Sequence, residues 1–178
     1  MTWIDALVQN LLAILNYCSP IRVIRVYERG VVFRWGRLRP TLDPGFHWIV
    51  PFRIDQVEIV TVIPEARNLL TQSVTTQDGV AVTFSVNVVF AIADAALMYT
   101  EVHDFHSMLD AVAMTHLAAR IRAQEWVDLL KNQPELERSL RGTLTTRVKD
   151  WGAQIVSVGI TDLVRAKPLR LFGDPPMR

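Results

Sequence analysis

The longest alternation of apolar and polar positions in the chain runs over residues 79–92. A period of two is the pattern of a β-strand with one face on a core and one face outward. At roughly 3.3 Å per residue the strand spans about 43 Å, so it needs partners along its whole length. Asp78-Gly79 is a turn signal, and residues 69–76 before it are the expected antiparallel neighbour. The bulky apolar positions are Val80, Val82, Phe84, Val86, Val88, Phe90 and Ile92.

Residues 1–20 carry apolar side chains at helical spacing, which predicts a strongly apolar amphipathic helix over residues 3–18. Such a helix rises roughly 24 Å, short of the ~30 Å hydrocarbon core of a bilayer. Carrying Asp5 through that core would cost on the order of 3 kcal/mol. We therefore expect a membrane-associated helix that lies in the interface or enters it shallowly, with docking on the protein core as the alternative. The predicted membrane contacts here are Trp3, Ile4, Leu7, Leu11 and Leu15.

Short strands are predicted between residues 21 and 63. Residues 23–27 and 31–35 are expected to pair as a hairpin around a turn at Arg29-Gly30. After a loop rich in Gly and Pro, residues 46–52 carry more apolar bulk than a loop should, and a further strand is predicted over residues 54–63. That bulk either caps the end of the sheet or contacts lipid. If these residues contact lipid, the predicted contact side chains are Phe46, Trp48 and Phe52.

The second half of the chain is predicted to be helical until a final strand. A short helix covers residues 94–99, and a longer one covers 104–122 with Asp104 as its N-cap. A third helix begins near Asn132, where Pro134 suits the first turn, and Gly152 is placed as its C-cap. Alternation then returns over residues 155–164.

Charge is balanced overall and uneven locally. The net charge is +1, but residues 22–39 contain six arginines against Glu28 alone. These arginines alternate with apolar residues and show no aromatic platform for stacking bases, so we expect no nucleic-acid binding. We expect these arginines to attract anionic lipid headgroups instead, which contributes about 1 kcal/mol per basic residue that reaches the membrane surface. The residues predicted for that role are Arg22, Arg25 and Arg29, and this arginine excess after the apolar segment favours a folded domain on the cytoplasmic face of the membrane.

The sequence offers no pattern typical of an enzyme. The histidines at positions 103, 106 and 116 lack the spacing of a zinc site, and the single cysteine, Cys18, lies in the apolar segment away from any histidine. There is no G-x-S-x-G elbow and no Gly-rich phosphate loop after a strand. We expect no catalytic residue, no metal and no cofactor.

Two motifs close together in the sequence resemble those of a known protein family. Residues 27–37 (YERGVVFRWGR) and 44–52 (PGFHWIVPF) resemble the opening of the stomatin/prohibitin/flotillin domain, also called the SPFH or Band 7 domain. Residues 75–82 and 151–156 resemble its later strands in the same order. The resemblance covers residues 21–165 and is closest to the stomatin-like group. It implies an α+β domain, largely an antiparallel sheet with packed helices, between the membrane-associated segment 1–20 and a Pro-rich tail, 166–178.

The resemblance also implies a function. Such domains are non-catalytic scaffolds on a lipid membrane that form homo-oligomers and organise or regulate membrane-protein clients, often proteases or channels. The family's long C-terminal helix is missing here, so we expect either a short form that assembles differently or a partner that supplies the missing part. We expect the tail to be ordered by contact with a second subunit or a partner chain. The residues predicted for that contact are Leu163, Val164, Leu169, Leu171 and Phe172. The alternative is a soluble adaptor that docks its N-terminal amphipathic helix into a partner's groove.

Overall fold

The computed structural model describes Gln9 and residues 20–166. The chain forms an α+β fold that divides into two compact units. Unit 1 comprises Met1–Pro64, Ala91–His103 and Lys149–Gln154. Unit 2 comprises Glu65–Phe90, Asp104–Val148 and Ile155–Arg178. All but one residue of the predicted N-terminal helix lies outside the described residues.

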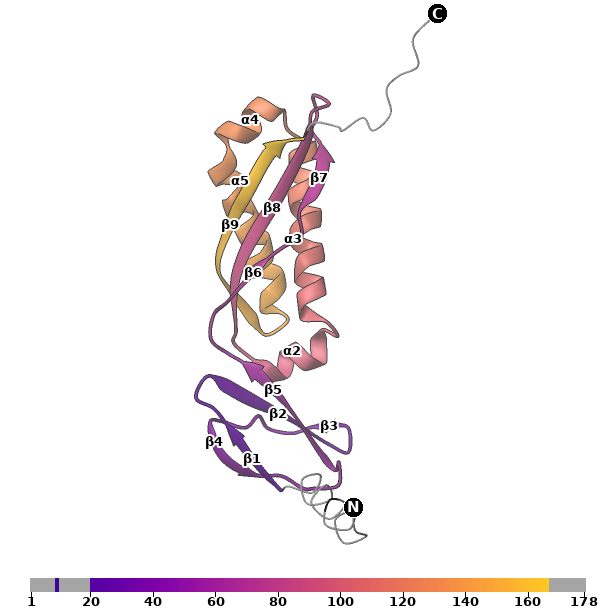
Figure 1. The fold of residues 1–178 in the computed structure, drawn as a ribbon, viewed down its shortest axis with the longest axis vertical. Coiled ribbons are helices and arrows are strands. Elements are labelled where there is room, and N and C mark those ends of the chain that lie inside the picture. Colours follow the sequence, from indigo (N-terminus) through magenta and orange to yellow (C-terminus); the bar gives the residue numbers. More distant parts are fainter. Residues whose placement is uncertain (1–8, 10–19, 167–178) are drawn as a thin grey trace, which may run out of the picture. The chain divides into compact units, whose positions relative to one another are not determined.

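Between residues 20 and 154, the described part of unit 1 consists of short antiparallel strands and the helix α2 (Figure 1). β1 pairs with β4, while β2 lies between β3 and β5. These elements are β1 (Ile21–Ile24), β2 (Glu28–Arg34), β3 (Arg37–Leu38), β4 (Gly45–Trp48), β5 (Asp55–Thr61) and α2 (Ala95–Glu101). The strand predicted over residues 54–63 is therefore confirmed as β5.

The predicted hairpin around Arg29-Gly30 is wrong. Both residues lie inside β2, and the chain turns earlier, where the Glu28 N–H donates to the Arg25 carbonyl at 3.0 Å. Gly30 is needed for close packing instead of a turn, because a Cβ there would lie 3.2 to 3.3 Å from Ile24, Leu42 and Val57. Gly30 therefore does mark a position that requires glycine, but the reason is close packing inside a strand and not a turn.

A second glycine in unit 1 meets the helix α2. Asp94 caps α2 by accepting from the N–H groups of Ala96 and Leu97. Gly152 has φ +75°, and its carbonyl accepts from the N–H groups of Ala93 and Asp94 at 2.9 and 2.7 Å. A Cβ at Gly152 would lie 2.3 Å from the Asp94 carbonyl oxygen, so glycine is required at this position by both space and dihedral angle.

Unit 2 is organised around the long predicted strand, which is confirmed as β8. β7 pairs antiparallel with its first half and β6 with its second half, and the Leu69 N–H donates to the Val86 carbonyl between them. β6 and β7 therefore lie one after the other along the same edge of β8. β9 also pairs with β8 and lies along the opposite edge. The strands are β6 (Glu65–Asn68), β7 (Gln72–Thr75), β8 (Ala81–Ile92) and β9 (Ala153–Arg165).

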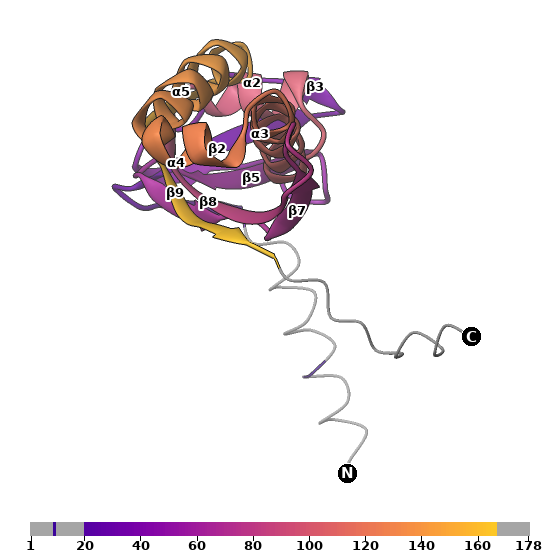
Figure 2. The same cartoon turned by 90° about the horizontal axis from the view of Figure 1, so that it is seen from above.

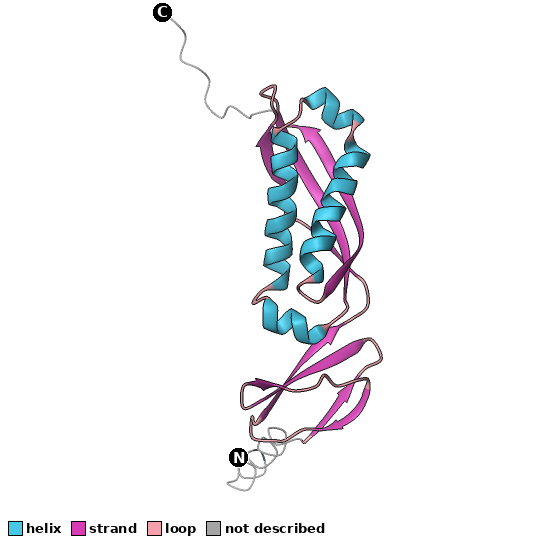
Figure 3. Cartoon of the chain, turned by 180° about the vertical axis from the view of Figure 1, so that it is seen from behind, coloured by secondary structure: helices cyan, strands magenta, loops and turns pink. Residues whose placement is uncertain are grey.

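The helices of unit 2 cover one face of this sheet. Figure 2 shows α3 and α5 on the same side of β7, β8 and β9. In Figure 3, which shows the chain from the opposite side to Figure 1, these helices lie in front of the strands. The apolar parity of β8 faces them, and Val82, Phe84 and Val86 are completely buried. α5 buries a stripe of apolar side chains formed by Leu136, Leu140, Leu144 and Val148. The helices are α3 (Phe105–Arg122), α4 (Trp126–Lys131) and α5 (Gln133–Lys149), and α4 was not predicted.

The opposite face of the sheet carries paired polar side chains. Ser73 and Thr83 share a hydrogen bond of 2.9 Å, and Ser85 donates to Asp162 at 2.7 Å. Asn87 donates to Asn68 at 2.5 Å. These pairs explain the polar parity of the alternation, because each is a cross-strand contact that satisfies a side chain pointing away from the helices.

Candidate membrane-contact surface

The β1–β4 ribbon of unit 1 presents an apolar face. Ile21 lies opposite Trp48 and Val23 opposite Phe46 in the strand register, so all four side chains share one face. Their exposed fractions are 41%, 72%, 62% and 56%, and the rings of Phe46 and Trp48 meet edge to face at 6.3 Å between centroids. The other parity places Ile24 in the core. An antiparallel ribbon thus holds its largest aromatic residues on its exposed face.

Two further aromatic residues are exposed on tight turns of unit 1. Trp35 and Phe52 have φ angles of +53° and +64°, which are uncommon for bulky residues. Their exposed fractions are 77% and 71%. The two turns are adjacent, because β2 and β5 are in register at this end and the Trp35 N–H donates to the Ile54 carbonyl at 3.1 Å. Such backbone strain persists only where the surroundings fix it.

An ion pair between Arg34 and Asp55 fixes the Phe52 turn. Arg34 donates through Nε and Nη2 to the two carboxylate oxygens of Asp55 at 2.6 and 2.8 Å. The same carboxylate accepts from the Val50 N–H at 2.8 Å, and its side chain is only 2% exposed. The Arg34 hydrogen bond holds the pKa of Asp55 below its ordinary value against the opposing effect of burial. The carboxylate therefore closes the loop between Val50 and Asp55 from the inside.

Arginines gather beside this pair. Arg34 lies opposite Arg37 on β3, and the Arg39 N–H continues the ladder by donating to the Val32 carbonyl at 2.8 Å. Arg37 and Arg39 are exposed, and neither forms an ion pair with another described residue. A cavity of about 280 Å³ is lined by Arg34, Arg39, Trp48, Ile49 and Asp55, among others. Cationic and aromatic side chains thus line one hollow in unit 1.

The structure places some of the predicted contact residues and leaves others outside its range. Phe46, Trp48 and Phe52 are all exposed, whereas Trp3, Ile4, Leu7, Leu11 and Leu15 lie outside the described residues. Sequence reasoning missed Ile21, Val23 and Trp35, because only the pairing of β1 with β4 and the strained turn reveal their exposure. In the described part of the chain, no helix has both the length and the apolar character needed to cross a bilayer.

The three predicted headgroup arginines differ in their surroundings. Arg22 is exposed on β1 opposite His47. Arg25 donates to the Tyr27 hydroxyl at 2.7 Å and lies 4.0 Å from Glu28, and Arg29 lies 3.4 Å from Asp43. Two of the three positive charges are therefore partly balanced by neighbouring carboxylates. Their role at a lipid surface stays a prediction.

The histidines of unit 2 take part in packing. His106 meets the rings of Phe90 and Phe105, and His116 lies within hydrogen-bond distance of Ser139 and Thr143. Within the described ranges, no group of three His, Cys, Asp or Glu side chains is placed to hold a metal ion.

Of the predicted oligomer contacts, two are described. Leu163 is half-buried and Val164 is exposed on β9. Leu169, Leu171 and Phe172 lie outside the described residues. The subunit contact of the tail stays a prediction.

Comparison with known proteins identifies the family. The SPFH domain / Band 7 family profile matches residues 22–168. The chain is 29% identical to an uncharacterized protein of Archaeoglobus fulgidus, covering 94% of this chain and 66% of that protein. It is 26% identical to a stomatin homolog of Pyrococcus horikoshii, covering 82% and 54% of the two chains. It is 29% identical to mouse stomatin-like protein 3, covering 80% and 50%. The chain spans half to two thirds of the length of these relatives, and because the profile covers most of its residues, it belongs to the SPFH domain / Band 7 family.

Proposed function

We propose that this chain is a non-catalytic, membrane-associated scaffold that forms homo-oligomers and organises or regulates neighbouring membrane proteins. Family membership supports the general part, because SPFH proteins are generally non-catalytic, associate with membranes and oligomerise. The single observation that supports this role most directly is the exposure of four aromatic side chains of unit 1, Phe46, Trp48, Phe52 and Trp35.

An exposed apolar surface of this kind favours a lipid interface. Removing a large apolar side chain from water stabilises the bound state by about 1.5–3 kcal/mol when burial is complete. Tryptophan suits the boundary region, because its ring is apolar while its N–H can still reach water. The strained turns hold Trp35 and Phe52 outward, so neither side chain must be pulled from the core before it can insert.

Arginines on the same unit would strengthen the contact. Arg39 lines the same cavity as Trp48, and Arg37 lies on β3, two residues earlier. We add both to the predicted headgroup contacts Arg22, Arg25 and Arg29. Each basic residue that reaches an anionic surface contributes about 1 kcal/mol, and salt screens this attraction. The contact would therefore prefer anionic lipids, while the aromatic part would be insensitive to salt.

Flotation with lipid vesicles tests the aromatic surface. The triple variant Phe46→Ser/Trp48→Ser/Phe52→Ser should float with vesicles of phosphatidylcholine and phosphatidylserine at least ~10-fold less than wild type. The matched control is Val26→Ser/Ile63→Ser, which removes exposed apolar side chains from the other end of the β2–β5 ladder and should float normally. Equal flotation of all three proteins would show that Phe46, Trp48 and Phe52 contribute nothing to lipid binding.

A second pair of variants tests the charges. Arg37→Gln/Arg39→Gln should lower binding to vesicles that contain phosphatidylserine and leave binding to phosphatidylcholine alone unchanged. Arg138→Gln/Arg147→Gln removes the same charge from exposed positions on α5 and is the control. The arginine contribution is refuted if both double variants weaken binding equally.

For location, we propose that the folded domain faces the cytoplasm, because the arginine excess follows the apolar N-terminal segment directly. Protease added outside intact cells should leave the domain uncut. Cleavage under those conditions would reverse the assignment.

A further inference from the structure

The outer edge of β7 carries unpaired backbone groups. The Thr76 N–H donates to the Val80 carbonyl at 2.9 Å, which fixes the alternation of the β7–β8 ladder. Val74 and Gln72, two and four residues earlier, therefore point their backbone groups toward β8. Ser73 and Thr75 point theirs away, and within the described residues no hydrogen bond to those outward groups is present. This edge is a template for one more strand.

The opposite edge of the sheet is protected. On β9, the Ile160 N–H donates to Glu137 at 2.9 Å, and the Val156 carbonyl accepts from Arg141 at 3.0 Å. Both side chains come from α5 and occupy backbone groups that another strand would need. The fold therefore blocks part of one edge and leaves the β7 edge accessible.

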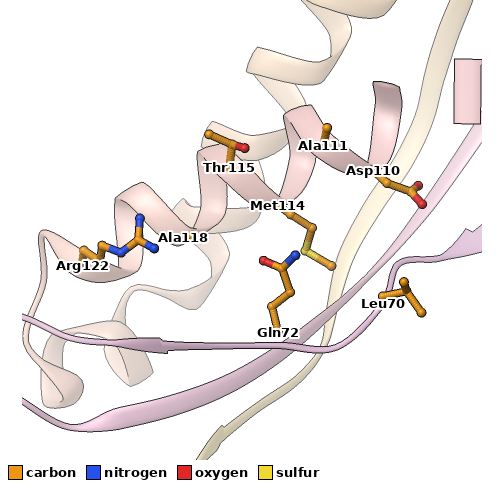
Figure 4. Close-up of a pocket in the computed structure, with 8 residues that line it drawn as sticks. All are labelled: Leu70, Gln72, Asp110, Ala111, Met114, Thr115, Ala118 and Arg122. Carbon is orange, nitrogen blue, oxygen red and sulfur yellow. The ribbon is translucent and has the colours of Figure 1, made fainter. Parts of the chain in front are cut away.

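A groove runs beside the accessible edge. Figure 4 shows Gln72 pointing from its strand toward Met114 on α3, with Leu70 and Asp110 at one end and Arg122 at the other. The cavity measures about 290 Å³, and the α3 wall includes the small residues Ala111 and Ala118. Small side chains on the helix leave room for one apolar side chain of an incoming strand.

The groove also has an unbalanced positive charge. Asp110 accepts a bidentate ion pair from Arg67 on β6, at 2.8 and 2.9 Å, so its charge is already matched. Arg122, at the other end, forms no ion pair with any residue of the described part. An occupant with a carboxylate near Arg122 would complete the electrostatics.

We propose that an extended segment of a partner protein adds as a strand to the β7 edge, placing an apolar side chain over Met114 and an acidic side chain at Arg122. A second copy of this chain's β7 does not fit that description. Its sequence, Gln-Ser-Val-Thr, has no acidic residue, and its single apolar side chain, Val74, is buried in its own core. This inference does not depend on lipid contact by unit 1.

Selection from random peptides displayed on phage tests the proposal while the partner itself is unidentified. The full chain in detergent is the bait, and Ala111→Trp, which fills the groove from an exposed helix position, is the counter-bait. Enriched peptides should carry an acidic residue near an apolar one and be lost on the counter-bait. Failure to enrich, or equal enrichment on both baits, would overturn the proposal.

Affinity measurements on one selected, labelled peptide then test each contact. Fluorescence anisotropy should show binding lost with Ala111→Trp and kept with Ala119→Trp, a matched change at an exposed α3 residue outside the groove lining. Arg122→Glu should weaken binding about 10-fold or more, and replacing the peptide's acid by Lys should restore it. An unchanged acid preference with Arg122→Glu contradicts the charge assignment.

Backbone pairing has its own signature. N-methylation of every second peptide residue should abolish binding in one parity and spare it in the other, because only one set of N–H groups faces β7. Equal effects in both parities would rule out strand addition. Particle mass by light scattering distinguishes the other occupant: if Ala111→Trp alters the oligomer, the edge belongs to a second copy and the partner proposal is wrong.

Discussion

Arg34 and Asp55 face each other across β2 and β5, and their bidentate ion pair lies directly beneath the turn that exposes Phe52. The Asp55 carboxylate also accepts from the Val50 N–H at the start of that turn. One buried carboxylate thus joins two strands and a loop, so the position of an exposed aromatic residue depends on a polar contact inside the unit.

Replacing that carboxylate should be costly. Asp55→Ala leaves Arg34 and the Val50 N–H without their partner, and breaking a buried pair costs about 3 kcal/mol of unfolding free energy. The control Asp43→Ala breaks the Arg29–Asp43 pair, whose carboxylate is 83% exposed, and should cost under ~1 kcal/mol. Denaturant unfolding of both variants measures the difference. Similar losses would mean that the buried pair is not special.

The two glycines at positions 152 and 142 should respond oppositely to alanine. Gly152→Ala places a Cβ 2.3 Å from the Asp94 carbonyl in a left-handed conformation, so we expect a loss of more than ~2 kcal/mol. Gly142 lies inside α5 with open space around it, so Gly142→Ala should stabilise the chain by about 0.5–1 kcal/mol. Thermal unfolding of the two variants measures both signs. Stabilisation by Gly152→Ala would contradict the packing described for α2.

His116 predicts a pH dependence of stability. Burial, with Arg120 nearby, lowers its pKa in the folded state below the ordinary value of 6.5. The unfolded chain therefore takes up the proton first as the pH falls, so stability is full above about 6.5 and declines below it toward the folded-state pKa. Denaturant midpoints measured above and below this pH range should differ more for wild type than for His116→Gln. His103→Gln, at an exposed position, is the control and should behave as wild type.

The N-terminal segment should carry much of the membrane attachment. Deleting residues 1–18 removes the apolar positions predicted to lie in the interface, and the remaining chain should move to the soluble fraction. Fractionation of cells that express each form measures this. If the truncated chain still floats with liposomes, the surface around Phe46 and Trp48 is the main contact.

The tail should link subunits. Residues 166–178 combine apolar residues with helix-breaking prolines, which suits ordering by contact with a neighbour. Removing them should shift the particle to smaller mass in detergent without unfolding the domain, as judged by circular dichroism. An oligomer of unchanged mass after this truncation would exclude the tail as the linking element.

Local patterns in the sequence determined the long strand, the longer helices and the family. The alternation centred on Phe84 predicts β8, the spacing from Leu136 to Val148 predicts the buried face of α5, and Asp94 and Asp104 cap the helices that follow them. Each signal acts over one strand or one helical turn, which is why sequence alone contains it. The motifs around Arg34 and Phe46 are likewise continuous stretches, so they indicate the family without any reference to geometry.

Only the tertiary structure decided which segments pair. β1 takes β4 as its partner instead of β2, and that register, set by residues about 25 positions apart, exposes Ile21 and Val23 beside Phe46 and Trp48. The open β7 edge and the protected β9 edge likewise follow from where α3 and α5 pack. Alternation specifies that a strand has two faces, but its neighbours and the covering of its edges depend on contacts distant in sequence, which no local pattern contains.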